Sequence, residues 1–183
     1  MEQFPNIEMS LIYARSINGY IGNNCEIPWV STKDMKHFKD TTYGHIVVMG
    51  SKTFGSLPDQ KPLKNRFNIV MTRGNKDYNC DLVINSKQQL YDWVQQNKDK
   101  YPLYYDNCYS HIFIIGGKQI YDLFIEDCDS IYESIIQDEY PGDTKAPIIP
   151  FNFKLQYQRS IDDRTLSVTF RKYIKDEFYK KFL

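Results

Sequence analysis

Short apolar segments alternate along the chain with amphipathic segments of helical spacing, and this alternation constrains the fold more than any other feature. The segments expected to be strands are Met9–Ala14, His45–Met49, Phe67–Thr72, Leu82–Ile84, His111–Ile115, Ser130–Ile136, Leu155–Ile161 and Leu166–Ile174. Strand–helix alternation that ends in a hairpin around Asp162–Arg164 predicts an α/β fold. Its sheet should be mixed and mostly parallel, flanked by helices, with a C-terminal antiparallel hairpin.

The predicted helices begin at capping residues. Their expected ranges are Ser31–Thr42, with Ser31 or Thr32 as the cap, Ser51–Leu57, Ser86–Asn97 and Lys118–Ile125. Gln89 stands three residues after Ser86 and is placed for a capping box. The longer loops expected between elements are Asn18–Pro28, rich in Gly, Asn and Pro, and Lys98–Ser110, rich in Tyr and Asn.

The length of 183 residues fits one domain over residues 1–183, with its core at about 9–174. The tail at 175–183 is either a short helix or the start of a connection. Lys plus Arg and Asp plus Glu number 23 each, so no net field attracts nucleic acid or an anionic membrane. We therefore expect neither nucleic acid nor a membrane as a partner. The expected state is a monomer with small-molecule partners.

The cysteines and histidines lack the spacing of metal ligands. Cys25, Cys80, Cys108 and Cys128 form no Cys-x-x-Cys pair, and the three histidines stand apart. Reduced thiols in a cytosol-like compartment are the simpler interpretation, without a metal site. No basic segment leads into an apolar run at the N-terminus, and no apolar stretch approaches the roughly 20 residues that span a bilayer. The expected location is the cytoplasm.

Two predicted strands end in glycine and lead directly into helices, at Gly50 and at Gly116-Gly117. A helix N-terminus presents free N–H groups, and glycine lets a phosphate approach the backbone. In parallel sheets, ligands bind at the carboxyl ends of strands, so the two junctions could hold the two halves of a dinucleotide. Neither is a complete Walker A or G-x-G-x-x-G motif, and an ordinary turn stays open at both.

Asp34 is the carboxylate most suited to chemistry, because it lies in the first turn of a predicted helix and shares a face with Phe38. In a dry cleft its pKa would rise toward the range of proton transfer. The alternative is a solvated acid favoured near a helix N-terminus. Arg66 and Arg73 flank a strand and suit carboxylate or phosphate, or are exposed structural residues. The 18–28 loop is an active-site lid or a surface loop.

These features occur in the order found in the dihydrofolate reductase family, which the chain resembles from about Met9 to Ile174. The segments that carry the resemblance are Ser10–Gly22, Ile27–Trp29 with Asp34 beyond, Val48–Thr53, Pro62–Arg66, Asn68–Arg73, Ile114–Tyr121 and Gly142–Thr144. The resemblance implies hydride transfer from NADPH to 7,8-dihydrofolate, giving 5,6,7,8-tetrahydrofolate for one-carbon metabolism and thymidylate synthesis. Antifolates such as methotrexate are the implied inhibitors.

The resemblance also implies roles for the substrate site. Asp34 matches the acid that hydrogen-bonds the pterin and favours protonation of its N5, and Trp29 matches the Trp associated with an ordered water. Ile27 and Ile21 match the lid that closes over the nicotinamide. The remaining substrate-binding positions are Ile12, Ala14, Met35, Phe38, Ser56, Leu57, Leu63, Arg66, Ile115, Tyr121 and Ser134. Among them, Ile12 and Ile115 would accept the pterin amino group through their carbonyls, and Arg66 would bind the glutamate carboxylate.

For the cofactor, the implied positions are Ala14, Ile21, Gly22, Gly50, Ser51, Lys52, Thr53, Thr72, Arg73, Ile115, Gly116, Gly117, Lys118, Gln119 and Ile120. Gly116 and Gly117 match a pair joined by a cis peptide, and Thr72 and Arg73 resemble a 2′-phosphate clamp. Ser51 departs from the family pattern because a cationic residue usually stands there. Phe54 replaces a Trp, and Ser134 replaces the threonine that supports the acid.

Other functions stay open on the residues alone. The pyrimidine reductase of riboflavin synthesis shares the sheet and cofactor clefts but not the Ile-Pro-Trp…Asp arrangement, so Asp34 discriminates between the two. A non-catalytic nucleotide-binding module is disfavoured because Asp34, Arg66 and Gly116-Gly117 are all present. A fusion with thymidylate synthase would need a partner beyond Leu183.

Overall fold

The computed structural model describes residues 7–97, 111–162 and 166–176, which form one eight-stranded sheet in the order β5-β4-β3-β6-β1-β7-β10-β9. Its strands are β1 (Met9–Ser16), β3 (Ile46–Gly50), β4 (Phe67–Met71), β5 (Leu82–Ile84), β6 (Ile112–Gly116), β7 (Ser130–Ile136), β9 (Phe153–Ile161) and β10 (Val168–Lys175). Strand β10 runs antiparallel to β7 and β9, and the other neighbouring pairs are parallel. The predicted fold class is confirmed.

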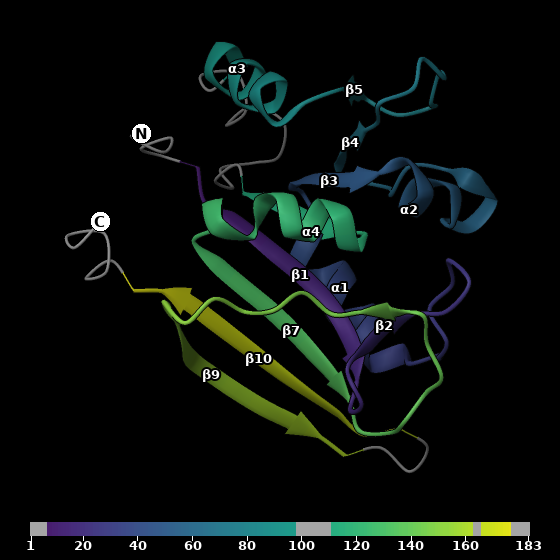
Figure 1. The fold of residues 1–183 in the computed structure, drawn as a ribbon, viewed down its shortest axis with the longest axis vertical. Helices are drawn as coiled ribbons and strands as arrows, with labels where there is room; N and C mark the ends of the chain where they lie inside the picture. The colour runs from purple at the N-terminus through teal and green to yellow at the C-terminus, as the bar shows by residue number, and fades with distance from the viewer. Residues whose placement is uncertain (1–6, 98–110, 163–165, 177–183) are drawn as a thin grey trace.

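The helices lie on both faces of this sheet (Figure 1). They are α1 (Thr32–Thr42), α2 (Ser51–Gly55), α3 (Lys87–Asn97) and α4 (Lys118–Phe124), with 3-10 turns η1 (Pro58–Gln60) and η3 (Ile125–Asp127). Helix α4 lies in front of the sheet in Figure 1 and α1 lies behind it. The Ser31 hydroxyl caps α1 by accepting from the Asp34 N–H at 3.2 Å, so the first of the two proposed caps is the one used.

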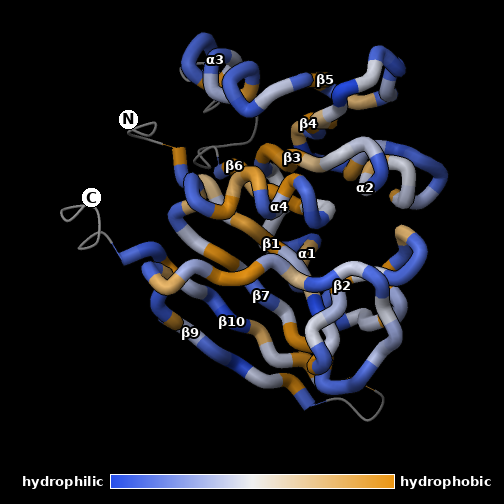
Figure 2. Tube along the Cα trace, viewed as in Figure 1, coloured by the Kyte–Doolittle hydropathy of each residue, from blue (hydrophilic) through white to orange (hydrophobic). Residues whose placement is uncertain are grey.

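Alternate residues of β1 enter two different apolar cores, as the two-residue period of a strand requires. Leu11 packs on the face covered by α3 and α4, with Leu90, Val94 and Phe124. Ile12 packs on the opposite face, in a cluster that includes Phe54 of α2 and Phe38 of α1. Figure 2 shows apolar residues concentrated in inner strands such as β3 and β6, whereas the edge strand β9 is mostly hydrophilic.

Several element boundaries differ from the expected ones. The 18–28 loop contains β2 (Tyr20–Gly22), which pairs with β8 (Thr144–Lys145) in a small second sheet. The helix expected over Ser51–Leu57 ends at Gly55, and Lys175 belongs to β10 and not to the tail. The expectations for the Lys98–Ser110 loop, the hairpin turn beyond Asp162 and the end of the tail lie outside the described residues.

The capping box at the start of α3 differs from the expected one in one contact, because the Gln89 side chain bonds the N–H of Asn85 and not that of Ser86. The Ser86 hydroxyl accepts from the Gln89 N–H at 3.2 Å, and the Gln89 side chain accepts from the N–H of Asn85 at 2.6 Å. Within the described residues, no helix is long and apolar enough to cross a membrane. In the same part of the chain, Cys25, Cys80 and Cys128 are free thiols and no group of His, Cys, Asp and Glu is arranged to hold a metal ion.

Candidate active site

The two strand–glycine–helix junctions lie side by side at the carboxyl edge of the sheet. Strands β3 and β6 are parallel neighbours, and Met49 is paired with Gly116 at their ends. A Cβ atom on Gly117 would lie 3.4 Å from the Thr53 hydroxyl of α2, and one on Gly50 would lie 3.1 Å from Ile120 of α4. The starts of α2 and α4 therefore face one another across a space that the absence of side chains keeps narrow.

Gly116 has a backbone conformation that other residues rarely adopt. Its φ is +112°, and an added Cβ would lie 2.9 Å from the Tyr121 hydroxyl. The Gly116–Gly117 peptide bond is cis, as the resemblance implied. Bare backbone is thus presented at the start of α4, which is the arrangement that allows a phosphate group to approach main-chain N–H groups.

Asp34 is half-buried at the start of α1. Burial raises the pKa of its carboxyl above the usual range, and a hydrogen bond from the side chain of Ser134 opposes that rise. Nearby, the buried Tyr121 hydroxyl donates to the Ile12 carbonyl at 3.0 Å. The pKa of Tyr121 is raised by burial and, to a smaller extent, by the charge of Asp34. Four elements, β1, α1, α4 and β7, therefore supply one polar cluster.

An apolar wall adjoins this polar cluster. Ile12 and Ile115 are buried members of one core, and Phe38, Leu57 and Leu63 pack against it. Ala14 packs in a neighbouring cluster with Trp29. Three positions from the resemblance are not brought into this wall: Ile27 is 65% exposed and Met35 is 64% exposed, while Ser56 is exposed and donates to the Thr53 carbonyl.

Trp29 is 6% exposed and packs against Tyr140, with ring centroids 5.5 Å apart. Its indole Nε1 is buried and has no hydrogen-bond acceptor among the described residues. A buried N–H without a protein acceptor is uncommon because it costs free energy, and such groups concentrate where a ligand or a water completes the site. Ala14, on β1, belongs to the same cluster as this indole ring.

Arg66 is half-buried beside the end of α1, and burial lowers the pKa of its guanidinium. It donates to the Lys64 carbonyl at 3.1 Å and to the Thr42 hydroxyl at 3.0 Å. Within the described part of the chain it forms no ion pair with a carboxylate. The role of Thr42 in orienting Arg66 was missed in the sequence, because the contact joins residues that are far apart in the chain.

Most of the residues expected on the cofactor side lie at the paired junctions, on α4 and β2, or just after β4. Thr53, Gly50, Gly116, Gly117 and Ile120 meet at the paired junctions. Gln119 is exposed on α4, where Lys118 pairs with Asp122 of the same helix, and Ile21 and Gly22 lie on β2. Thr72 follows β4 and accepts from the Gly74 N–H at 3.1 Å, with Arg73 exposed beside it.

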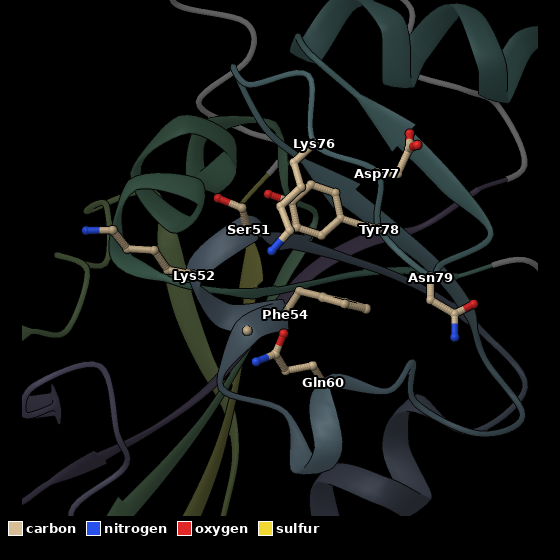
Figure 3. A pocket seen from close by; sticks show the side chains of 9 residues that line it. Ser51, Lys52, Phe54, Gln60, Lys76, Asp77, Tyr78 and Asn79 are labelled. Carbon is tan, nitrogen blue, oxygen red and sulfur yellow. The ribbon is translucent and has the colours of Figure 1, made fainter.

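A cavity of about 310 Å³ opens between α2, η1 and the loop before β5. Figure 3 shows the side chains that line it: Ser51, Lys52, Phe54, Gln60, Lys76, Asp77, Tyr78 and Asn79. Ser51 and Lys52 were expected on the cofactor side, and the other lining residues were missed. Their only signal in the sequence is a basic residue near an aromatic one shortly after a predicted strand.

Paired strand–glycine–helix junctions at the carboxyl edge of a mostly parallel sheet define an α/β enzyme of the nucleotide-binding kind. The family model for dihydrofolate reductase matches residues 8–175. The chain belongs to the dihydrofolate reductase family. The expectation of a reductase of this class, with NADPH as its cofactor, is thereby confirmed at the level of the family.

Relatives of known identity agree with this assignment. A dihydrofolate reductase of Ureaplasma parvum serovar 3 is 34% identical over 160 residues, which cover 85% of this chain and 92% of that protein. One from Staphylococcus aureus is 33% identical over 146 residues, covering 80% of each chain. The structure of dihydrofolate reductase from Enterococcus faecalis complexed with NADP(H) and RAB-propyl is 24% identical, with a TM-score of 0.79 over 92% of this chain and 96% of that one. The last similarity supports the fold.

Proposed function

We propose that the protein reduces 7,8-dihydrofolate to 5,6,7,8-tetrahydrofolate with NADPH, and so supports one-carbon metabolism and thymidylate synthesis. The observation that carries the proposal is Asp34, a half-buried carboxyl whose pKa is raised by burial and which lies beside an apolar wall. A carboxyl in such a site can both orient a flat, amino-bearing heterocycle and retain a proton near neutral pH.

The paired junctions fit the cofactor. Gly116 and Gly117 leave the start of α4 without side chains, and Thr53 offers a hydroxyl on the facing helix. Lys118 and Gln119 would place main-chain N–H groups at a pyrophosphate. The N–H of Ile120, the third residue expected there, already donates to the Gly117 carbonyl at 2.9 Å. When bound, NADPH supplies the hydride that reduces C6 of the pterin. We infer that Ile21, Gly22 and Ile27 form the part of the chain that covers the nicotinamide.

The chemical contribution of Asp34 follows from the charge that the reduction creates. Addition of hydride at C6 leaves negative charge on N5 unless a proton arrives, so a nearby proton source lowers the barrier. We infer that Asp34 binds the pterin 2-amino group and favours protonation of N5, with Trp29 beside the ordered water that relays the proton. The Ser134 hydrogen bond and the Tyr121–Ile12 contact hold the surrounding groups in position.

Arg66 suits the glutamate end of the substrate. Its contacts with the Lys64 carbonyl and the Thr42 hydroxyl fix the guanidinium plane without neutralising its charge. A planar guanidinium binds a carboxylate through two parallel hydrogen bonds. The apolar wall formed by Phe38, Leu57 and Leu63 would cover the aromatic ring between the pterin and the glutamate.

The balanced charge, with 23 basic and 23 acidic residues, gives no net field to attract nucleic acid, which supports small molecules and antifolates as the partners. We infer a monomer as well. We further infer a single domain over residues 1–183 and a cytoplasmic location.

The proposal is tested by following the NADPH absorbance band after dihydrofolate is added to the protein. We expect dihydrofolate-dependent oxidation of NADPH that methotrexate abolishes at a concentration close to that of the enzyme. Absence of turnover at high protein concentration would reject the proposed reaction. Turnover with a pyrimidine intermediate of riboflavin synthesis, together with insensitivity to methotrexate, would instead favour the related reductase.

A further inference from the structure

The cavity between α2 and the loop before β5 contains a lysine whose position is defined by aromatic packing. The Lys76 ammonium lies 5.7 Å from the centre of the Tyr78 ring, and Tyr78 packs edge-on against the buried Phe54 of α2 at 5.6 Å. A cation over an aromatic face is attracted to it, so Tyr78 directs the ammonium toward the cavity. The side chain of Lys76 is therefore connected to α2 through two rings.

The same cavity is bordered by the start of α2. Ser51 and Lys52 line it together with Lys76. Figure 3 shows the Lys76 ammonium directed toward α2, while the Lys52 ammonium and the Asp77 carboxylate point away from it. Within the described residues, neither Lys76 nor Arg73 forms an ion pair. Ser51, Gln60 and Tyr78, which line the cavity with Lys76, are neutral, so the Lys76 ammonium gives this side of the cavity a positive charge that suits an anion.

The location of the cavity relates it to the cofactor. Strands β6, β3 and β4 are neighbours in the sheet, so a dinucleotide with its pyrophosphate at the Gly116–Gly117 junction would extend along their carboxyl ends toward β4. Thr72 and Arg73 follow β4, and the Asn85 side chain fixes this end by donating to the Thr72 carbonyl at 2.9 Å. Lys76 comes from the same connection between β4 and β5, and it lines one cavity with Ser51 of α2.

We propose that Lys76, held over Tyr78, supplies the cation that Ser51 lacks and binds the 2′-phosphate of NADPH together with Arg73. The Ser51 hydroxyl donates a further hydrogen bond to the phosphate. The inference rests on the proposed use of NADPH and adds the residues that would distinguish it from NADH. Its consequence is that the preference for a phosphorylated cofactor depends on the loop before β5, and not on the start of α2 alone.

Equilibrium binding tests the proposal without turnover. Isothermal titration of the wild type, Lys76→Gln and Lys76→Arg would use 2′,5′-ADP and 5′-AMP as the probes, which differ by the 2′-phosphate. For Lys76→Gln we expect binding of 2′,5′-ADP to weaken about tenfold, or about 1.4 kcal/mol, with 5′-AMP almost unchanged. Lys76→Arg should retain the preference. High salt should reduce the wild-type preference because the contact is exposed to solvent.

A matched control is Lys172→Gln. Lys172 also lies over a tyrosine ring, that of Tyr132 at 5.0 Å, but it comes from β10 near the other end of the sheet. It should leave both affinities unchanged. A double variant, Lys76→Gln with Ser51→Arg, restores a cation from the opposite wall and should recover the affinity for 2′,5′-ADP.

The outcomes distinguish the role of Lys76 from the proposed reduction of dihydrofolate with NADPH. If the wild type prefers 2′,5′-ADP and Lys76→Gln keeps that preference, or if Lys172→Gln reduces it equally, the role of Lys76 is rejected while the proposed reduction stands. If the wild type binds neither 2′,5′-ADP nor NADPH, both proposals are rejected. Because Lys76 is exposed, unchanged thermal unfolding is expected for each of its variants.

Discussion

The side chain of Ser134, on the central strand β7, hydrogen-bonds the Asp34 carboxyl at the start of α1. Two opposing effects therefore act on one acid: burial raises its pKa, and the serine hydroxyl favours the charged form. The balance between them determines how much of Asp34 is protonated near neutral pH. Residues far apart in the chain thus control the group proposed to assist protonation of the pterin.

Removal of that hydroxyl should shift the pH dependence of the reaction. In Ser134→Ala the hydrogen bond that lowers the pKa of Asp34 is lost, so the pKa rises further. If proton supply depends on neutral Asp34, the rate of hydride transfer falls as pH rises through that pKa, and the fall should move to higher pH. Single-turnover rates across a pH series would measure it. Ser134→Thr keeps a hydroxyl and should resemble the wild type; a fall at unchanged or lower pH contradicts the assignment.

Asp34→Asn should lose activity and gain stability. General acid catalysis contributes roughly 100-fold or more, so turnover at neutral pH should drop by at least that factor while NADPH still binds. Because the folded pKa of Asp34 lies above the unfolded value, its contribution to stability is fully present below the unfolded pKa and is lost as pH rises through the folded pKa. Asparagine avoids this loss and should stabilise the fold at neutral pH, on the order of 1 kcal/mol.

Urea unfolding of the wild type and Asp34→Asn at several pH values would check the expected gain in stability. The stability advantage of Asp34→Asn should shrink as the pH falls, because the wild-type carboxyl then becomes neutral as well. An advantage that is independent of pH would point to packing and not to charge as its cause.

The alternation of strands and helices was sufficient to predict the sheet. A parallel strand that is buried on both faces consists of consecutive apolar residues, as in Ile46–Gly50, and such a run is visible in the sequence. The β2 and β8 pairing was not predictable, since strands of three and two residues show no periodicity. The same limit applies to Asp34, whose helical spacing is equally typical of a solvated acid. Its burial depends on Ser134 and on the packing of distant elements, so only the family pattern favoured the functional interpretation.

Substitution of Arg66 should weaken binding of the substrate's glutamate. Arg66→Leu removes a guanidinium already oriented by Thr42, and loss of a charge-assisted contact should raise the KM for dihydrofolate about tenfold or more. The value of kcat should change much less, because the contact is far from the reacting atoms. Steady-state kinetics with a dihydropterin that lacks the glutamate supply the control, and the two proteins should then have similar KM values. An unchanged KM for dihydrofolate would rule out the contact.

Gly116→Ala should disrupt the cofactor cradle through two separable effects. The φ of +112° is strained for alanine, and the new Cβ would lie 2.9 Å from the Tyr121 hydroxyl. We expect a loss of about 1–3 kcal/mol in unfolding free energy and weaker binding of NADPH. Thermal unfolding without NADPH measures the loss of stability, and the additional shift when NADPH is present measures its binding.

Two comparison variants distinguish these effects. Gly55→Ala meets no atom within 4 Å and serves as the control for stability, which should stay nearly unchanged. Adding Tyr121→Phe to Gly116→Ala removes the hydroxyl, but ring carbons remain at 3.0 and 3.1 Å from the Cβ position, so only part of the loss should be recovered. Full recovery would mean that the hydroxyl contact alone requires glycine at this position. No recovery would mean that glycine is required at position 116 because of its backbone conformation. In that case the main chain would be accessible to the dinucleotide only when residue 116 has no side chain.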